Sequence, residues 1–98
     1  MGFKDVKRRL ILALLEGRYR NVPRATIEVK NVLHTGLLDS DEVALIVMGC
    51  RGTEHQVIPH HRFPQVNLHL MITRGWYIKF YFVDADVALI SVHRTETS

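Results

Sequence analysis

The sequence contains a single cysteine and no long run of apolar residues. Cys50 has no second thiol with which to form an internal disulfide, which is typical of a protein from a reducing compartment. The longest apolar run, Leu10–Leu15, is far shorter than the roughly 20 residues that span a membrane. Charges resume at once and no small-residue cleavage pattern follows, so we expect neither an export signal nor a membrane partner. These absences predict a cytoplasmic protein.

Motifs for common cofactors and for nucleophilic catalysis are also missing. The chain has no phosphate-binding P-loop, no dinucleotide fingerprint and no glycine-flanked serine elbow, so we expect no cofactor. His55, His60 and His61 form a cluster, but adjacent histidines point apart on a regular strand and no cysteine accompanies them. We therefore predict no metal site. A loop that folds these histidines around Glu54 or His69 is the alternative, and would make the chain a metal-binding protein.

What is present indicates one globular domain. Ninety-eight residues, of which 47% are hydrophobic and 23% charged, are enough for a single core and too few for two. The net charge is +3, and basic residues crowd the first quarter: Lys4, Lys7, Arg8, Arg9, Arg18, Arg20 and Arg24. Such asymmetry indicates a polyanion or an acidic protein as partner. A solvated face of an amphipathic helix explains it equally well.

The pattern of apolar residues predicts helices in the first half of the chain. The segment Phe3–Gly17 repeats apolar residues at helical spacing, and a second helix begins at Asp39 or Ser40 and ends at Gly49. The segment Ala25–Leu33 fits either a short strand or a helix, and residues 18–23 are expected to form a basic loop. The mainly helical part therefore covers residues 3–51 of the single domain 1–98.

Residues 53–94 predict an antiparallel sheet, followed by a polar tail at 95–98. An edge strand at 53–58 ends at Pro59, and three alternating strands follow at 66–72, 76–82 and 88–93. Arg74-Gly75 and Asp84-Ala85-Asp86 are the expected turns. The fold class is thus α+β, with two or three N-terminal helices packed on one face of a C-terminal antiparallel sheet of three to four strands.

Strand alternation assigns most of the chemically capable side chains to one face of this sheet. If Leu68, Leu70 and Ile72 face the core, then His69 faces away from it. The same reasoning turns Trp76, Phe80 and Phe82 inward. The residues predicted on the outer face are His69, Tyr77, Lys79, Tyr81, Leu89, Ser91 and His93. His60, His61 and Arg62 are expected in a loop at the approach to this face.

Two histidines beside a lysine and a phenol suit the cleavage of RNA by transesterification. Histidine both takes and gives protons near neutral pH, so His69 and His93 are the candidates for proton transfer. Lys79 would stabilise charge on the phosphorane, with Arg62 or Arg94 assisting. Tyr77 completes the predicted catalytic set. The residues expected to bind the substrate are His60, His61, Arg62, Tyr81, Ser91 and Arg94, through stacking and phosphate contacts.

The end of the chain resembles small bacterial toxins of the RelE and MqsR type, within the wider class of barnase-like ribonucleases. The resemblance lies in Tyr77-Ile78-Lys79 and Ile90-Ser91-Val92-His93, and in the order of a helical half before a small sheet. It implies a metal-independent endoribonuclease that cleaves mRNA and is neutralised by an antitoxin. Tyr77 matches the catalytic tyrosine of these toxins. Their final-strand lysine falls near His93 or Arg94, and histidine there favours acid–base work over charge stabilisation alone.

The residues leave another class of function open. The same face would equally serve a non-catalytic module that binds RNA or an acidic protein, because bases stack on aromatic rings and phosphates pair with cations whether or not a bond is cleaved. RNA is the expected partner of the enzyme, with an acidic antitoxin protein as a second partner, and the binding module would hold RNA or an acidic protein.

Overall fold

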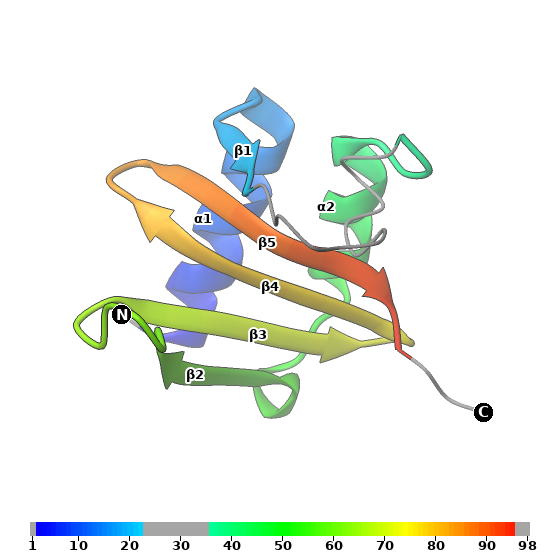
Figure 1. Cartoon of the computed structure of the whole chain (residues 1–98). Coiled ribbons are helices and arrows are strands. Elements are labelled where there is room, and N and C mark those ends of the chain that lie inside the picture. Colours follow the sequence, from blue (N-terminus) through cyan, green and yellow to red (C-terminus); the bar gives the residue numbers. More distant parts are fainter. Residues whose placement is uncertain (1, 23–35, 96–98) are drawn as a thin grey trace.

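A computed structural model describes residues 2–22 and 36–95 of the chain. Its elements follow the order α1 (Phe3–Glu16), β1 (Tyr19–Asn21), α2 (Ser40–Met48), a 3-10 turn (Gly52–Glu54), β2 (His55–Pro59), β3 (Asn67–Thr73), β4 (Trp76–Val83) and β5 (Asp86–Arg94). The predicted α+β class is confirmed, with two α-helices in the described residues (Figure 1). The ambiguous segment Ala25–Leu33 lies outside them.

Both helices begin and end where the sequence provides the right terminal residues. Helix α1 stops at Gly17, whose φ of 73° is a left-handed conformation that glycine adopts without strain. Helix α2 starts at Asp39, whose carboxylate accepts the backbone N–H of Glu42 at 2.9 Å. The Glu42 carboxylate accepts the N–H of Asp39 at 3.0 Å in return. This reciprocal capping box satisfies two backbone donors that a helix start otherwise leaves unpaired.

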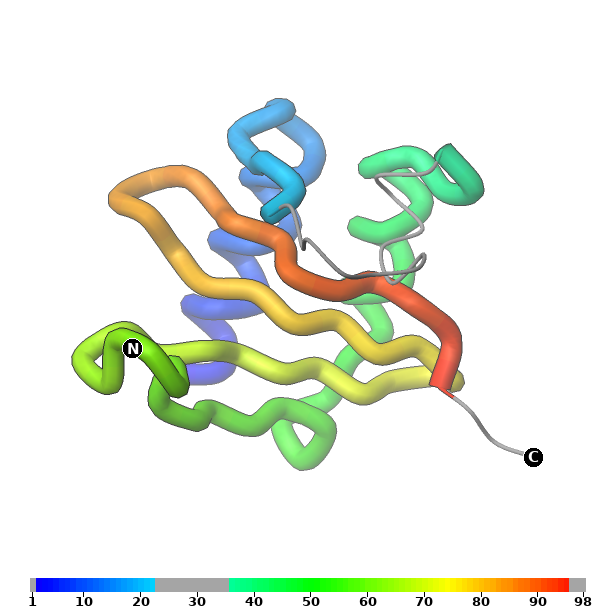
Figure 2. The backbone as a smooth tube through the Cα atoms, viewed as in Figure 1, coloured from blue at the N-terminus to red at the C-terminus, as the bar shows by residue number. Residues whose placement is uncertain are grey.

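Within the described residues, the sheet has five strands in the order β1-β5-β4-β3-β2, not three to four (Figures 1 and 2). Strands β2 to β5 are antiparallel as predicted, but β1 runs parallel to β5. This strand occupies part of the predicted basic loop, where three residues are too few to show an alternating pattern. It forms because the Val87 N–H donates to the Arg18 carbonyl at 3.0 Å and the Val22 N–H donates to the Leu89 carbonyl at 2.8 Å.

Two tight turns fix how the last three strands pair. Arg74 and Gly75 have φ values of 52° and 81°, and form a two-residue turn that sets Thr73 opposite Trp76. The β4–β5 turn is Asp84-Ala85, one residue shorter than predicted, because Val83 already pairs with Asp86. Residues directly opposite each other share a face, so each turn decides which side chains of its two strands point the same way.

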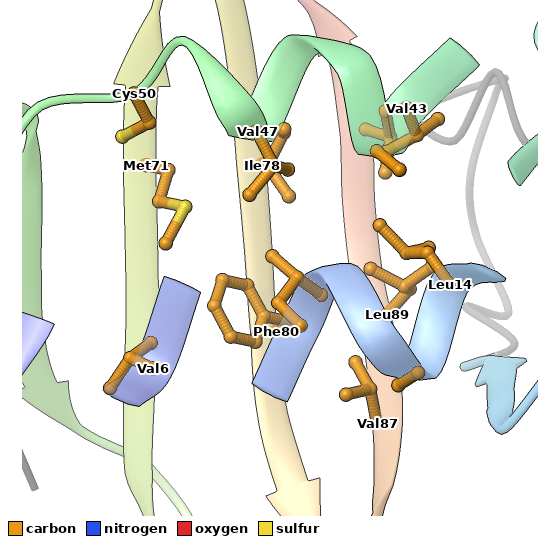
Figure 3. Close-up of a cluster of buried hydrophobic side chains, with 14 residues drawn as sticks. Val6, Leu14, Val43, Val47, Cys50, Met71, Ile78, Phe80, Val87 and Leu89 are labelled. Atoms are coloured by element: carbon orange, nitrogen blue, oxygen red, sulfur yellow. The ribbon is translucent and has the colours of Figure 1, made fainter. Parts of the chain in front are cut away.

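The core lies between the helices and one face of the sheet. Leu10 and Leu14 of α1, with Val43 and Val47 of α2, are fully buried against it. The sheet contributes Met71, Ile78, Phe80, Val87, Leu89 and Val92, several of which appear with the helix side chains in Figure 3. We call this the helix side, and the opposite surface the open face. No helix in the part of the chain that the structure describes is long and apolar enough to cross a membrane.

Candidate functional site

Strands β4 and β5 present the predicted polar side chains on the open face. Tyr77 lies opposite His93 and Lys79 lies opposite Ser91, while the intervening Ile78 pairs with Val92 in the core. Tyr81 follows two residues beyond Lys79, on the same side. The structure therefore brings five of the predicted residues together: Tyr77, Lys79, Tyr81, Ser91 and His93.

A β-bulge is responsible for placing Ser91 and His93 on this face. The pairing steps from Phe80–Leu89 to Lys79–Ser91, which leaves Ile90 as an extra residue on β5. Leu89 is therefore in the core, and its predicted position beside Ser91 on the open face is wrong. Ala88 points to the open face instead, opposite Tyr81. A strict alternation across residues 87–93 would have placed either Leu89 or His93 on the wrong side.

Tyr77 and His93 form a stacked pair on the open face. Their ring centroids are 4.9 Å apart and their planes differ by 17°. The Nδ1 of His93 lies 2.8 Å from the carbonyl oxygen of Arg94, and because a carbonyl only accepts, Nδ1 carries the proton. In the neutral ring the lone pair is then on Nε2. The side chain is partly exposed, so this nitrogen is available to accept a proton.

Lys79 and Ser91 lie next to this pair along the same strands. Side chains two residues apart on one face of a strand are about 7 Å apart, which is within reach of a single bound nucleotide. Lys79 is partly exposed, whereas Ser91 is only 3% exposed. The cation is therefore accessible to a substrate, whereas Ser91, a predicted substrate-binding residue, is buried.

His69 is not on the open face, and the predicted alternation of β3 is wrong. It lies opposite Phe80 of the core and is 6% exposed, next to Met71, which is fully buried against the helices. Leu68, Leu70 and Ile72 occupy the open side of β3. Both sides of this strand are largely apolar. The positions of its apolar residues therefore do not indicate which side packs against the helices. The two-residue turn was the usable signal, because it places Thr73, Met71 and His69 on the side of Trp76, Ile78 and Phe80.

His69 instead forms a hydrogen-bonded pair with His55 under helix α1. Nε2 of His55 and Nδ1 of His69 are 3.1 Å apart, and the ring planes differ by 10°. The centroid separation of 5.3 Å exceeds the nitrogen–nitrogen distance by about two ring radii, so the rings meet edge to edge and share one proton. Phe3 of α1 lies against His55, and Phe80 and Phe82 lie against His69.

Burial makes this pair a poor proton carrier at neutral pH. The pKa of His69 is lowered to about 4, mainly by desolvation and in addition by the charges of His55, Arg9 and the amino terminus. Desolvation also lowers the pKa of His55. Both rings are therefore neutral near pH 7, and the His69 ring is buried, whereas His55 is partly exposed. The two-histidine arrangement expected on one face is replaced by one histidine with a tyrosine and a lysine.

The loop after β2 carries His60, His61 and Arg62 to the other end of the open face. His60 contacts Tyr81 edge-on at 6.0 Å and stacks on His61 at 4.9 Å. Arg62 is exposed on the same loop. Arg94, by contrast, pairs with Trp76 on the helix side, where its guanidinium lies 4.9 Å from the indole. It is therefore separated from the other predicted substrate-binding residues.

Several basic residues of the first quarter hold the fold together. Lys7 donates to the Cys50 carbonyl at 3.0 Å, and Arg9 donates to the Asp84 carbonyl at 2.7 Å while lying 4.1 Å from the Phe82 ring. Arg18 donates to the Ala85 carbonyl. Part of the basic character of this segment is thus explained by hydrogen bonds that its side chains donate to backbone carbonyls elsewhere in the fold.

One cation on the open face was missed by sequence reasoning. Arg20 of β1 lies beside Ala88 in parallel register, and is exposed on the side that carries Tyr81. No pattern in a three-residue strand could have revealed this. Among the described residues, Lys79 and Arg20 thus lie on the open face, and Arg62 is exposed on the loop at its edge.

Neither metal-ligand geometry nor comparison with known proteins identifies the site. Within residues 2–22 and 36–95, no group of three or more histidine, cysteine, aspartate or glutamate side chains is arranged to hold a metal ion. Glu54, the suggested fourth ligand, accepts the Arg51 backbone N–H at 2.7 Å, which lowers its pKa. Comparisons with protein-family models, curated proteins and solved structures give no match.

Proposed function

We propose that the protein is a metal-independent endoribonuclease that acts in the cytoplasm as the toxin of a toxin–antitoxin pair. The observation that carries the proposal is the Tyr77–His93 pair, in which a histidine with an available Nε2 is stacked on a phenol beside Lys79. A base, an acid and a cation are the three groups that cleavage of RNA at its 2′-hydroxyl requires. The sequence resemblance to RelE- and MqsR-type toxins supports the same activity.

The proposed reaction begins with proton removal by His93. Its Nε2 takes the proton of the 2′-hydroxyl while the 2′-oxygen attacks the adjacent phosphorus. The bond from phosphorus to the 5′-oxygen then breaks and leaves a 2′,3′-cyclic phosphate on one fragment. Tyr77 donates its phenolic proton to the departing 5′-oxygen, and the Lys79 ammonium stabilises the negative charge that develops on the phosphorane.

The partner proposed from the resemblance is an acidic antitoxin protein. The formal charge of +3 favours association with an acidic protein, and an inhibitor of this kind keeps the ribonuclease inactive until it is removed. The open face is the surface that we expect such an inhibitor to cover or deform. A small reading frame next to the gene, encoding an acidic protein, is the corresponding genetic expectation.

Incubation of the purified protein with single-stranded RNA in the presence of EDTA tests the activity. We expect fragments that end in 2′,3′-cyclic phosphate and 5′-hydroxyl groups, detected by mass spectrometry. A Leu45→Ala variant, changed at a residue that is 63% exposed on α2, serves as the control and should cleave normally. Salt-sensitive RNA binding without any product would contradict the enzyme and establish a binding module.

A further inference from the structure

The loop between β2 and β3 is held rigidly around the ring of His60. The Nδ1 of His60 accepts the backbone N–H groups of Arg62 and Phe63, at 3.0 and 3.2 Å. The His60 N–H donates to the Val66 carbonyl at 2.9 Å, and the Val66 N–H donates to the Phe63 carbonyl at 2.8 Å. Four hydrogen bonds within seven residues fix the loop before any ligand binds, which lowers the entropy lost on binding.

This rigid loop presents aromatic rings to solvent. Phe63 is 51% exposed, and its ring lies 5.5 Å from that of His60. His61 is also exposed, and its ring stacks on the His60 ring. Tyr81 contacts His60 from the open face. We call His60, His61, Phe63 and Tyr81 the loop cluster. The exposed parts of these rings add little to the stability of the fold and stay available to a ligand.

The geometry points to a second RNA-binding position at the loop cluster, which stacks an unpaired base away from the cleaved bond. This inference rests on the proposed ribonuclease function. Base–aromatic stacking is the chemistry that exposed, rigid rings offer to single-stranded nucleic acid. Arg62 is exposed on the same loop, and supplies a cation for the phosphate of that nucleotide.

The distance between the Tyr77–His93 pair and the loop cluster determines how far from the cleaved bond the stacked nucleotide lies. Tyr77 and Tyr81 are four residues apart on β4, which corresponds to about 13 Å along a strand. That distance equals up to four stacked base steps of about 3.4 Å, and fewer in an extended strand. A dinucleotide placed at Tyr77 and His93 therefore cannot reach the loop cluster, whereas an octanucleotide can. Figure 2 shows the loop at the opposite end of the sheet from the β3–β4 turn.

Substrates of two lengths test the inference in the enzyme assay. In Phe63→Leu and His61→Ala, we expect kcat/KM for an octanucleotide to fall about tenfold, as for loss of one stacked base. Cleavage of a dinucleotide should stay within twofold of the wild type. Leu45→Ala on α2 is the matched exposed control and should change neither value. Equal losses for both substrates, or no loss for the octanucleotide, would overturn the inference while leaving the ribonuclease function intact.

A binding measurement separates this inference from the proposed function. An octanucleotide with 2′-O-methyl groups cannot be cleaved, and its affinity is read by fluorescence anisotropy. About tenfold weaker binding by Phe63→Leu, with unchanged binding by Leu45→Ala, supports the loop cluster even if no RNA is ever cleaved. Unchanged binding by both Phe63→Leu and His61→Ala would overturn it.

Discussion

The two sides of the sheet each hold a histidine against another ring, with opposite consequences. On the helix side, the rings of His55 and His69 meet edge to edge, and their facing nitrogens are hydrogen-bonded to each other. On the open face, His93 stacks flat on Tyr77 and leaves Nε2 available. The first arrangement buries His69 and lowers the pKa of both rings, whereas the second leaves His93 partly exposed to solvent. Burial and ring orientation, more than the presence of histidine, decide which site can transfer a proton.

The comparison also explains why each pair has its own kind of neighbour. The buried pair is enclosed by Phe3, Phe80 and Phe82, which raise the cost of a charge and add no acid or base. The exposed pair has Lys79 beside it, a cation directed to the same surface. We therefore expect substitutions on the open face to change activity and substitutions in the buried pair to change stability.

Removal of the imidazole of His93 should have the largest effect. General acid–base catalysis contributes roughly 10²- to 10⁴-fold, so His93→Ala should reduce kcat by that factor in the RNA cleavage assay. Its melting temperature should stay close to that of the wild type, because the side chain is partly exposed. The distinction between the two sides fails if His93→Ala cleaves RNA normally while folded.

Loss of the buried imidazole should affect folding instead. His69→Ala leaves a cavity beside Phe80 and Phe82 and deprives His55 of its partner, and should lower the free energy of unfolding by about 2–4 kcal/mol. Urea denaturation at pH 7 measures the change. His61→Ala, at an exposed position, is the control and should cost less than about 0.5 kcal/mol. Equal costs for the two variants would show that the His55–His69 pair does not stabilise the fold.

The low pKa of His69 makes part of the stability depend on pH. The pKa is about 4 in the folded protein and 6.5 in the absence of burial, so the unfolded chain binds the proton more readily. The contribution is fully present above about pH 6.5 and is lost as the pH falls toward 4, by at most about 3 kcal/mol. The variant His69→Leu keeps an apolar group of similar size but cannot titrate. Urea denaturation of the wild type and of this variant at several pH values gives the contribution of His69 as the difference between their pH dependences.

A second measurement makes the pH prediction site-specific. Proton NMR should show that the His69 ring titrates near pH 4, well below an exposed histidine. If His69 titrates near 6.5, or if the two proteins lose stability equally between pH 7 and 4.5, the buried pair is open to solvent and the contrast between the two sides disappears.

Much of this arrangement follows from local sequence signals, and its failures have clear physical causes. Gly17, Asp39 and the Arg74-Gly75 turn marked the ends of elements because each satisfies a local backbone requirement. Strand β4 was assigned correctly because one of its sides is aromatic and aliphatic and the other is polar. Such contrast depends on only a few neighbouring residues, which is why the sequence alone reveals it.

The errors arose where the pattern depends on distant parts of the chain. Strand β3 is apolar on both sides, so only its pairing with β4 shows that His69 faces the helices. In β5, the bulge at Ile90 interrupts the alternation, and nothing in the local sequence announces it. Strand β1 exists only through its hydrogen bonds to β5. A site can therefore be predicted from strand alternation only if the register of every strand is known. Two-residue hairpin turns are the clearest indication of that register in the sequence.

The smallest predicted effect concerns the contacts that Arg9 of α1 makes with Phe82 and with the β4–β5 turn. Substitution of the adjacent Arg8 provides a control for it. Arg9 lies on the Phe82 ring and donates to Asp84, whereas Arg8 forms an exposed ion pair with Asp5 at 3.4 Å. Arg9→Ala should lower the free energy of unfolding by about 1 kcal/mol, and Arg8→Ala by less than about 0.5 kcal/mol, in urea denaturation at pH 7. Because Phe82 also lies against His69, the loss of Arg9 should loosen the cover of the buried pair and raise its accessibility to hydrogen exchange. A larger loss of unfolding free energy in Arg8→Ala than in Arg9→Ala would mean that the contacts between α1 and the β4–β5 turn do not stabilise the fold.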